Sequence, residues 1–239
     1  MAGHSHWKNI KRKKAVIDAR RGQAWSKVAR VIMIAAQRGG NPNDNIALRM
    51  AMEKGRAVNM PNDTIEKAIK KGTGELGKTH FDGVLYEGYG PGGVAILVDS
   101  LTDNRNRTAG EIRMAFDKHG GAVGAANSVG WMFTKKGVIN VEKAKSTEEQ
   151  LMDIALAAGA EDIVTSEEGF EITTAMVDFE KVRKALETAK IEMASADLIM
   201  IPSQTVAATG AVAEMVQTLI DALEAHDDVQ NVYTNAEME

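Results

Sequence analysis

Apolar residues recur at helical spacing through the first third of the chain. One stripe has spacings of four, three and four residues, as one face of an α-helix requires, and is formed by Ala24, Val28, Val31 and Ala35. A second helix is predicted to begin near Ile46. A third is predicted near Asp63, with Asp63 and Glu66 as an acidic capping box and Gly72 as its end. Residues 1–78 are therefore expected to form an all-helical domain.

Beyond His80 the apolar spacing shortens to two, and glycines mark the turns. The glycine-rich segment 88–93 separates two short apolar runs, which is typical of a β-hairpin. A helix and a further strand follow before residue 134. The expected elements are strands at 84–86 and 94–98, a helix at 105–118 and a strand at 129–133.

The next segment, 135–202, gives a more diagnostic order of elements. Strand, helix, strand, strand, helix and strand follow one another, which is the split βαβ order of ferredoxin-like domains. Such a sheet is covered by both helices on one face, and both predicted helices carry apolar residues for that role. The predicted elements are strands at 137–141, 162–165, 170–174 and 197–201 and helices at 147–158 and 179–188.

A helix at 210–225 and a strand at 229–233 remain after that unit is complete. We predict that they complete the earlier strands, so that 79–134 with 203–239 forms a discontinuous α+β domain into which 135–202 is inserted. The expected fold class is α+β, with an N-terminal three-helix domain plus two ferredoxin-like α+β domains, one inserted in the other. Packing of the last helix against the N-terminal helices would contradict this arrangement.

Composition narrows the possible functions. Hydrophobic residues make up 44% and charged residues 26% of the 239 residues, as in an ordinary globular protein with a buried core. Because the chain has no cysteine, disulfides, thiolate zinc sites and cysteine nucleophiles are excluded together. No apolar run approaches the roughly 20 residues of a membrane-spanning helix. We therefore expect a cytoplasmic protein without a metal or other cofactor.

The net charge of −4 hides a segregation of sign. Residues 1–78 hold 17 Lys and Arg against 6 Asp and Glu, a net charge of +11, so the remainder carries −15. A basic segment of this kind favours a polyanionic partner, because Lys and Arg displace condensed counterions from phosphates. In the alternative interpretation, the basic segment docks on the acidic part of its own chain.

The candidate nucleic-acid-binding residues lie mostly in this basic third. Trp7 and two histidines can stack on bases while the cations that follow meet phosphates. Further cations lie on the polar face of the first predicted helix and on the outward face of the third predicted helix. The set is His4, His6, Trp7, Lys8, Lys11, Arg12, Lys13, Lys14, Arg20, Arg21, Lys27, Arg30, Lys67, Lys70 and Lys71. Alternatively, Trp7 anchors this segment on the protein's own core. The two histidines alone supply too few ligands for zinc.

A polar segment with two arginines, residues 102–108, lies where a strand passes into a helix. Backbone amides at the helix start, together with Arg105 and Arg107, can grip a phosphate or an RNA backbone. The alternative is ordinary capping of the helix by Asp103, Asn104 or Asn106, with both arginines in solvent. The residues leave both interpretations open.

The sequence gives no support for a catalytic or nucleotide-binding site. Gly88, Gly90 and Gly93 match the dinucleotide fingerprint in letters, but a strand follows them where the fingerprint needs a helix, so they are expected to serve turn geometry. His80, His119 and His226 are isolated in the sequence, and no serine lies in a nucleophile elbow. An enzyme is therefore not expected.

Four of these segments together resemble a known family. They are the opening MAGHSHWKNIK, YEGYGPGG at 86–93, TDNRNRT at 102–108 and Ile201-Pro202, and they look like the YebC/PmpR family over essentially the whole chain. The resemblance implies a helical N-terminal domain and two α+β domains, one inserted in the other. It also implies that the chain is a transcriptional regulator that binds DNA. Related proteins act in translation, and one of them is a mitochondrial translational activator.

Three functions are therefore compared. The first is a DNA-binding transcriptional regulator, whose binding should depend steeply on salt and weakly on sequence. The second is a translation factor that binds ribosomal RNA through its basic end. The third is a protein-interaction module that binds no nucleic acid. The oligomeric state does not follow from the sequence.

Overall fold

The structure is a computed structural model, and it describes residues 21–77 and 80–238. The chain divides into two compact units. One is built on Trp131–Ala207, and the other includes the described residues up to Gly130 together with Ala208–Glu237. Among the described residues, no helix combines the length and apolar character that crossing a membrane requires.

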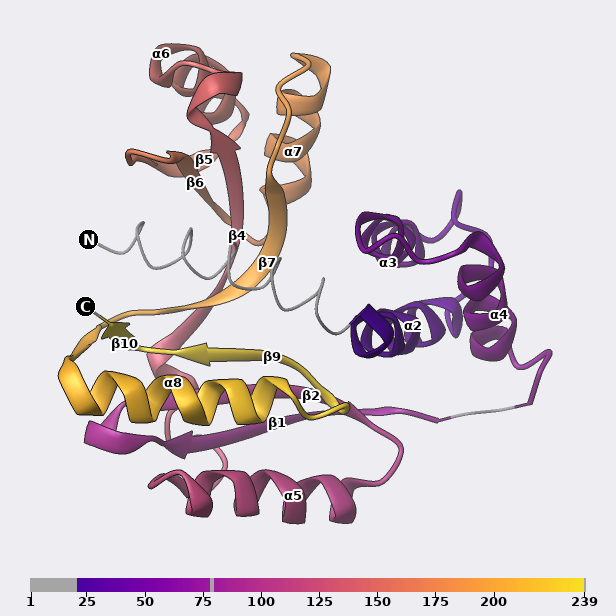
Figure 1. Ribbon diagram of the computed structural model, residues 1–239. Helices are drawn as coiled ribbons and strands as arrows, with labels where there is room; N and C mark the ends of the chain where they lie inside the picture. Colours follow the sequence, from indigo (N-terminus) through magenta and orange to yellow (C-terminus); the bar gives the residue numbers. More distant parts are fainter. Residues whose placement is uncertain (1–20, 78–79, 239) are drawn as a thin grey trace. The chain divides into compact units, whose positions relative to one another are not determined.

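Three helices form the N-terminal part (Figure 1): α2 at Arg21–Ala36, α3 at Ile46–Ala57 and α4 at Asn62–Thr73. Their shared core includes Ile32, Leu48 and Ile65, each at most 2% exposed. Asn45 caps α3, because its side chain accepts a hydrogen bond from the Leu48 N–H. The same side chain donates to the carbonyl of Ala35 in α2 and to that of Gly39 in the loop after it.

Two expectations about α4 are wrong. Asp63 and Glu66 form no capping box, because the N-cap is Pro61 and none of the described side chains caps this helix. Gly72 does not end the helix either: α4 continues to Thr73, and Gly74 follows with the left-handed φ of 88°. A Cβ built on Gly72 would lie 2.3 Å from the Met33 carbonyl oxygen, so this glycine permits the close approach of α4 to α2.

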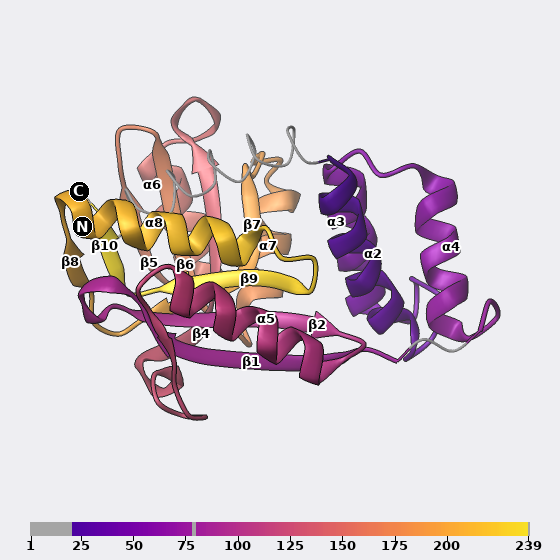
Figure 2. The same cartoon turned by 60° about the horizontal axis from the view of Figure 1, so that its bottom comes forward.

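The first sheet joins strands from both ends of the chain. Its order is β3-β1-β2-β9, and β9 pairs antiparallel with β2. Helices α5 and α8 pack against each other on one face (Figures 1 and 2), where Phe116 of α5 and Leu219 of α8 are fully buried. The C-terminal helix and strand thus complete the earlier hairpin. The elements are β1 at Asp82–Tyr89, β2 at Ala95–Thr102, α5 at Arg105–Lys118, β3 at Ala122–Val123, α8 at Gly210–Glu224 and β9 at Val229–Thr234.

The second sheet has the order β5-β6-β4-β7, which is the ferredoxin-like arrangement of a βαββαβ chain. A π-helical turn, η4 at Met152–Leu156, continues α6. The elements are β4 at Phe133–Glu142, α6 at Glu148–Leu151, β5 at Ala160–Thr165, β6 at Gly169–Ala175, α7 at Phe179–Thr188 and β7 at Ser195–Pro202. The expected α+β fold class with one domain inserted in the other is confirmed.

Short elements connect these larger ones. The glycine-rich hairpin turn contains the 3₁₀ turn η1 at Pro91–Gly93. Gly92 and Gly93 have φ of 73° and 75°, left-handed values that glycine adopts readily because it has no side chain. Two further 3₁₀ turns are η2 at Gly130–Met132 and η3 at Lys143–Lys145. A separate two-stranded sheet pairs β8, Val206–Ala208, with β10, Ala236–Met238.

The strand expected at 129–133 is wrong in its first part. Residues 130–132 form η2, and β4 begins only at Phe133. The physical reason is that the N–H groups of Val129 and Gly130 donate to the carboxylate of Glu87, so these amides are not available to a strand ladder.

Candidate nucleic-acid interface

The exposed side of α4 carries three of the predicted cations. Ile65 and Ala68 of this helix face the core, while Lys67, Lys70 and Lys71 are exposed. Within the described part of the chain, none of these three ammonium groups has a carboxylate partner. Because the three lie within five residues on an amphipathic helix, they present one compact basic surface to solvent.

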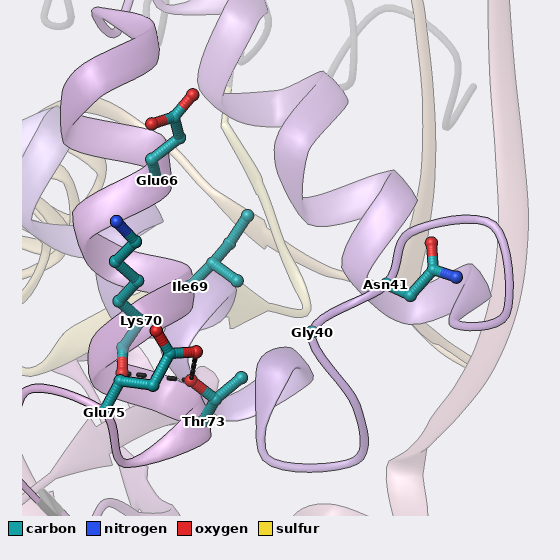
Figure 3. A pocket seen from close by; sticks show the side chains of 7 residues that line it. All are labelled: Gly40, Asn41, Glu66, Ile69, Lys70, Thr73 and Glu75. Carbon is teal, nitrogen blue, oxygen red and sulfur yellow. Dashed lines mark hydrogen bonds between the residues drawn. The ribbon is translucent and has the colours of Figure 1, made fainter.

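An open cavity of about 440 Å³ lies beside this surface, between α4 and the loop after α2 (Figure 3). Lys70 lines it together with two carboxylates, Glu66 and Glu75. The Thr73 hydroxyl donates to the Lys70 carbonyl at 3.1 Å or to Glu75 at 3.0 Å. With two acids for one ammonium, the lining does not favour an anionic ligand in the cavity itself.

The cations predicted on α2 contact the protein's own chain. Lys27 Nζ donates to the Glu224 carbonyl at 2.6 Å, and Arg30 lies 2.9 Å from the carboxylate of Asp228. The Gln23 side chain and Arg30 also donate to carbonyls of Ala225 and Asp227, respectively. These acceptors end α8 or follow it, where the helix dipole concentrates negative charge. The end of α8 thus contacts α2, while its body packs on the first sheet.

Asp228 is the centre of this contact. Its side chain is 2% exposed and accepts hydrogen bonds from Arg107 Nη2 at 2.7 Å and from the Thr108 hydroxyl at 2.6 Å, in addition to the Arg30 ion pair. Burial alone would raise the pKa of Asp228, but the hydrogen bonds from Thr108 and Arg107 and the charge of Arg30 hold that pKa below its usual value. Asp228 therefore links α2 to the start of α5.

The polar segment 102–108 adopts the capping geometry. Asn104 caps α5 by accepting the Arg107 N–H at 3.1 Å, and its own N–H donates to the Thr102 hydroxyl at 2.9 Å. Arg105 donates to Asp82 at 3.0 Å, and Arg107 also pairs with Asp103 at 2.9 Å. The hydrogen bonds to Asp228 and Asp103 raise the pKa of Arg107. A phosphate contact by Arg105 or Arg107 stays a prediction, and it would have to compete with these carboxylates.

The remaining predicted residues lie elsewhere. Arg21 begins α2. Residues outside the described ranges are His4, His6, Trp7, Lys8, Lys11, Arg12, Lys13, Lys14 and Arg20. Among residues 21–77 and 80–238, no group of three His, Cys, Asp or Glu side chains is placed to hold a metal ion.

Sequence reasoning missed two carboxylates that organise the fold. Asp228 was overlooked because Arg107 lies 121 residues away in the chain and Arg30 still farther. Glu87 accepts backbone N–H groups of Asn127, Val129 and Gly130 at 2.6–2.8 Å. Neither carboxylate belongs to a local pattern that reveals its partners.

Comparison with known proteins covers nearly the whole chain. A family model described as the TACO1/YebC second and third domain matches residues 81–236, and another described as the TACO1/YebC protein N-terminal domain matches residues 5–75. A relative from Pelotomaculum thermopropionicum, named "Probable transcriptional regulatory protein", is 52% identical over 242 residues and covers 100% of both chains. A relative of the same description from Thermoanaerobacter pseudethanolicus is 51% identical, covering 100% of this chain and 98% of its own.

A solved structure shares the fold. The crystal structure of a conserved hypothetical protein from Aquifex aeolicus matches with a TM-score of 0.84 and 43% sequence identity, and the match covers 93% of each chain. The arrangement of helices and sheets described above is therefore shared with a protein whose structure was determined by experiment.

Proposed function

Because the chain belongs to the TACO1/YebC family, we propose that it is a non-enzymatic, nucleic-acid-binding regulator of gene expression that binds DNA in the cytoplasm. This membership confirms the resemblance seen in the sequence motifs. The names of the relatives describe transcriptional regulatory proteins and no enzyme, in agreement with the expectation from the sequence.

The observation that carries the proposal is the basic surface of α4. Lys67, Lys70 and Lys71 are exposed and have no carboxylate partner among the described residues, whereas Arg30 and Arg107 pair with Asp228. Cations without a carboxylate partner can meet phosphates at no cost in broken ion pairs. Residues 1–78 carry a net charge of +11, so this surface belongs to the part of the chain that attracts a polyanion.

The mode of binding follows from the residue types. Lysine ammonium groups contact phosphates as point charges and carry little base specificity. Each phosphate contact makes the logarithm of affinity fall with the logarithm of salt concentration by a slope of about 0.9. We therefore expect binding that weakens steeply with salt and discriminates little between sequences.

A matched pair of triple variants tests this function. In the first, Lys67, Lys70 and Lys71 become Gln; in the control, the exposed Lys135, Lys181 and Lys184 of the second sheet domain become Gln. Affinity for duplex DNA is measured across a salt series. The first variant should bind at least roughly tenfold more weakly at low salt, with a slope smaller by about 3. Equal losses in both variants, or no loss in either, would reject the α4 surface as the binding site.

Segregation of charge favours a second candidate, a factor that binds ribosomal RNA. The residues after 78 carry −15 and would be repelled along extended DNA, whereas a basic end could enter a structured RNA site. Sedimentation of a lysate with and without nuclease separates the two functions. Protein running with ribosomes would favour the translation role, and protein at the top of the gradient that shifts DNA would favour the transcription role.

A further inference from the structure

A row of directly opposed polar residues crosses the second sheet. By the strand register, Asn140 of β4 lies opposite Glu171 of β6 and, on its other side, opposite Ser195 of β7. Side chains alternate along β4, and Gly137 lies on the face covered by α7, since a Cβ there would be 2.4 Å from the Phe179 ring. The three polar residues therefore lie together on the opposite face of the sheet.

Two buried acceptors in this row lack donors. Asn140 is 2% and Glu171 5% exposed. Asn140 Nδ2 donates to Ser195 Oγ at 3.1 Å, but Asn140 Oδ1 and Glu171 Oε2 accept no hydrogen bond within the described residues. Directly opposite residues have Cβ atoms about 4.5–5.5 Å apart, so the amide and the carboxyl are within hydrogen-bonding reach of each other. Because a protonated carboxyl is a donor, a single proton shared between the two oxygens would satisfy both.

The charges around Glu171 favour that proton. The charged groups on the elements beside it are Lys136 and Glu142 of β4, Lys143 and Lys145 of η3, Glu161 and Asp162 of β5, and Asp197 of β7. Lys136 and Lys145 are compensated, because each pairs with a glutamate at 2.6–2.7 Å. The helix α7 packs on the other face of the sheet. Burial, followed by the charge of Asp162, raises the pKa of Glu171 to about 7.

We propose that Glu171, Asn140 and Ser195 form a proton-controlled switch with two hydrogen-bonded states. In the neutral state, the Glu171 carboxyl donates its proton to Asn140 Oδ1, and Asn140 Nδ2 donates to Ser195 Oγ as observed. When the carboxyl loses its proton to water, the amide makes half a turn about its Cβ–Cγ bond. Asn140 Nδ2 then donates to the carboxylate, and the Ser195 hydroxyl donates to Oδ1. The loss of one proton thus reverses both hydrogen bonds of the row.

Rotation of the amide follows from the donors that the row contains. Without it, ionised Glu171 would face Asn140 Oδ1, and two acceptors would lie together in a buried place. After the half turn, Asn140 supplies an N–H donor to the carboxylate and Ser195 an O–H donor to the amide oxygen. The switch lies wholly in the second sheet and requires no nucleic acid. Its midpoint lies near neutral pH, because burial holds the pKa of Glu171 far above its ordinary value.

Nuclear magnetic resonance on the full chain follows the proton and the amide separately. The carboxyl carbon of Glu171 reports its ionisation, and the side-chain amide protons of Asn140 report their acceptor. As the pH rises, the amide signals should move to lower field, because a carboxylate is a stronger acceptor than a hydroxyl. Both residues should titrate with one midpoint near pH 7.

A matched pair of variants identifies the group that controls the amide. Glu171→Gln keeps an N–H donor in place of the carboxyl proton, so it should hold Asn140 in its neutral-state orientation at every pH. Glu142→Gln makes the same chemical change at an exposed position on the same face of β4, and it should leave the titration of the Asn140 amide in place. Circular dichroism checks that both variants keep their fold.

The outcomes are distinct. Coincident titrations that Glu171→Gln abolishes and Glu142→Gln preserves would establish the switch. An Asn140 amide that stays unchanged while Glu171 titrates would overturn the rotation, and a Glu171 carboxyl that is already ionised well below neutral pH would overturn the neutral state. An Asn140 titration that persists in Glu171→Gln would overturn control by Glu171. The first two contrary results come from the natural chain alone, so the test holds even if a variant fails to fold.

Discussion

Two buried glutamates, one in each sheet, show how differently the same residue type can be used. Glu87 of β1 is 6% exposed and Glu171 of β6 is 5% exposed. The two oxygens of Glu87 accept three backbone N–H groups at 2.6–2.8 Å. Oε2 of Glu171 accepts none within the described residues. The exposed fractions are therefore nearly equal, but Glu171 lies deeper among protein atoms, and the supply of donors differs as well.

The pKa values move in opposite directions as a result. Burial acts to raise the pKa of both carboxyls, but the amides of Val129, Asn127 and Gly130 hold the pKa of Glu87 below its usual value. Burial and Asp162 raise the pKa of Glu171 to about 7. A carboxylate with enough internal donors anchors a loop. A buried carboxylate without them destabilises the fold when it is ionised.

Glu87→Ala should have the largest effect on stability. It would leave three loop amides without an acceptor, and at roughly 1–3 kcal/mol for each unsatisfied group the free energy of unfolding should fall by about 4 kcal/mol. Urea unfolding measures the change, and the exposed Glu167→Gln is the control. A loss no larger than that of the control would mean that water replaces the carboxylate and that the loop is not anchored by Glu87.

Glu171→Gln should have the opposite sign above pH 7. The folded pKa of about 7 exceeds the ordinary value of 4.5, so the folded state holds a proton that the unfolded state has lost. Stability therefore falls as pH rises from about 4.5 to 7, by up to about 3 kcal/mol at 1.4 kcal/mol per pKa unit. The variant should lose this decline and exceed the natural protein in stability at pH 8.

Urea unfolding at several pH values checks the Glu171 prediction. The measurement is made at high ionic strength, where exposed charges act less on the titration of Glu171. If the natural protein and Glu171→Gln show parallel pH profiles, Glu171 titrates with an ordinary pKa, and its environment supplies donors after all.

Local patterns in the sequence predicted the elements but not these long-range contacts. The helices at 105–118 and 179–188 were found with the predicted bounds, because amphipathic spacing and turn residues define them locally. The strand at 129–133 was misjudged because Glu87, about 40 residues earlier, captures its amides. For the same reason the sequence did not indicate Asp228, the carboxylate that pairs with Arg30 and Arg107.

Asp228 extends the comparison to a carboxylate whose donors include two arginine side chains. Asp228→Asn should lower the free energy of unfolding by about 2 kcal/mol, because a 2% exposed charge loses its ion pairs with Arg30 and Arg107. The folded pKa lies below the ordinary value of 3.8, so this stability is present at neutral pH and is lost as pH falls below about 4. The variant should therefore show a smaller loss of stability in acid. The free energy of unfolding of the variant is measured at pH 7 and at pH 3. If it falls between these pH values by as much as in the natural protein, Asp228 does not have this role.

The smallest effect is expected for an ion pair that lacks burial. Arg105 and Asp82 lie 3.0 Å apart, but their side chains are 63% and 36% exposed, so water can replace either partner. Arg105→Gln should change the free energy of unfolding by less than about 0.5 kcal/mol. A loss as large as that of Asp228→Asn would mean that pairing alone, and not burial, sets these energies.

Because the Arg105→Gln variant should stay folded, it also tests the predicted phosphate contact. Weaker DNA binding at unchanged stability would assign that contact to Arg105. Unchanged binding would mean that Arg105 serves only the capping segment.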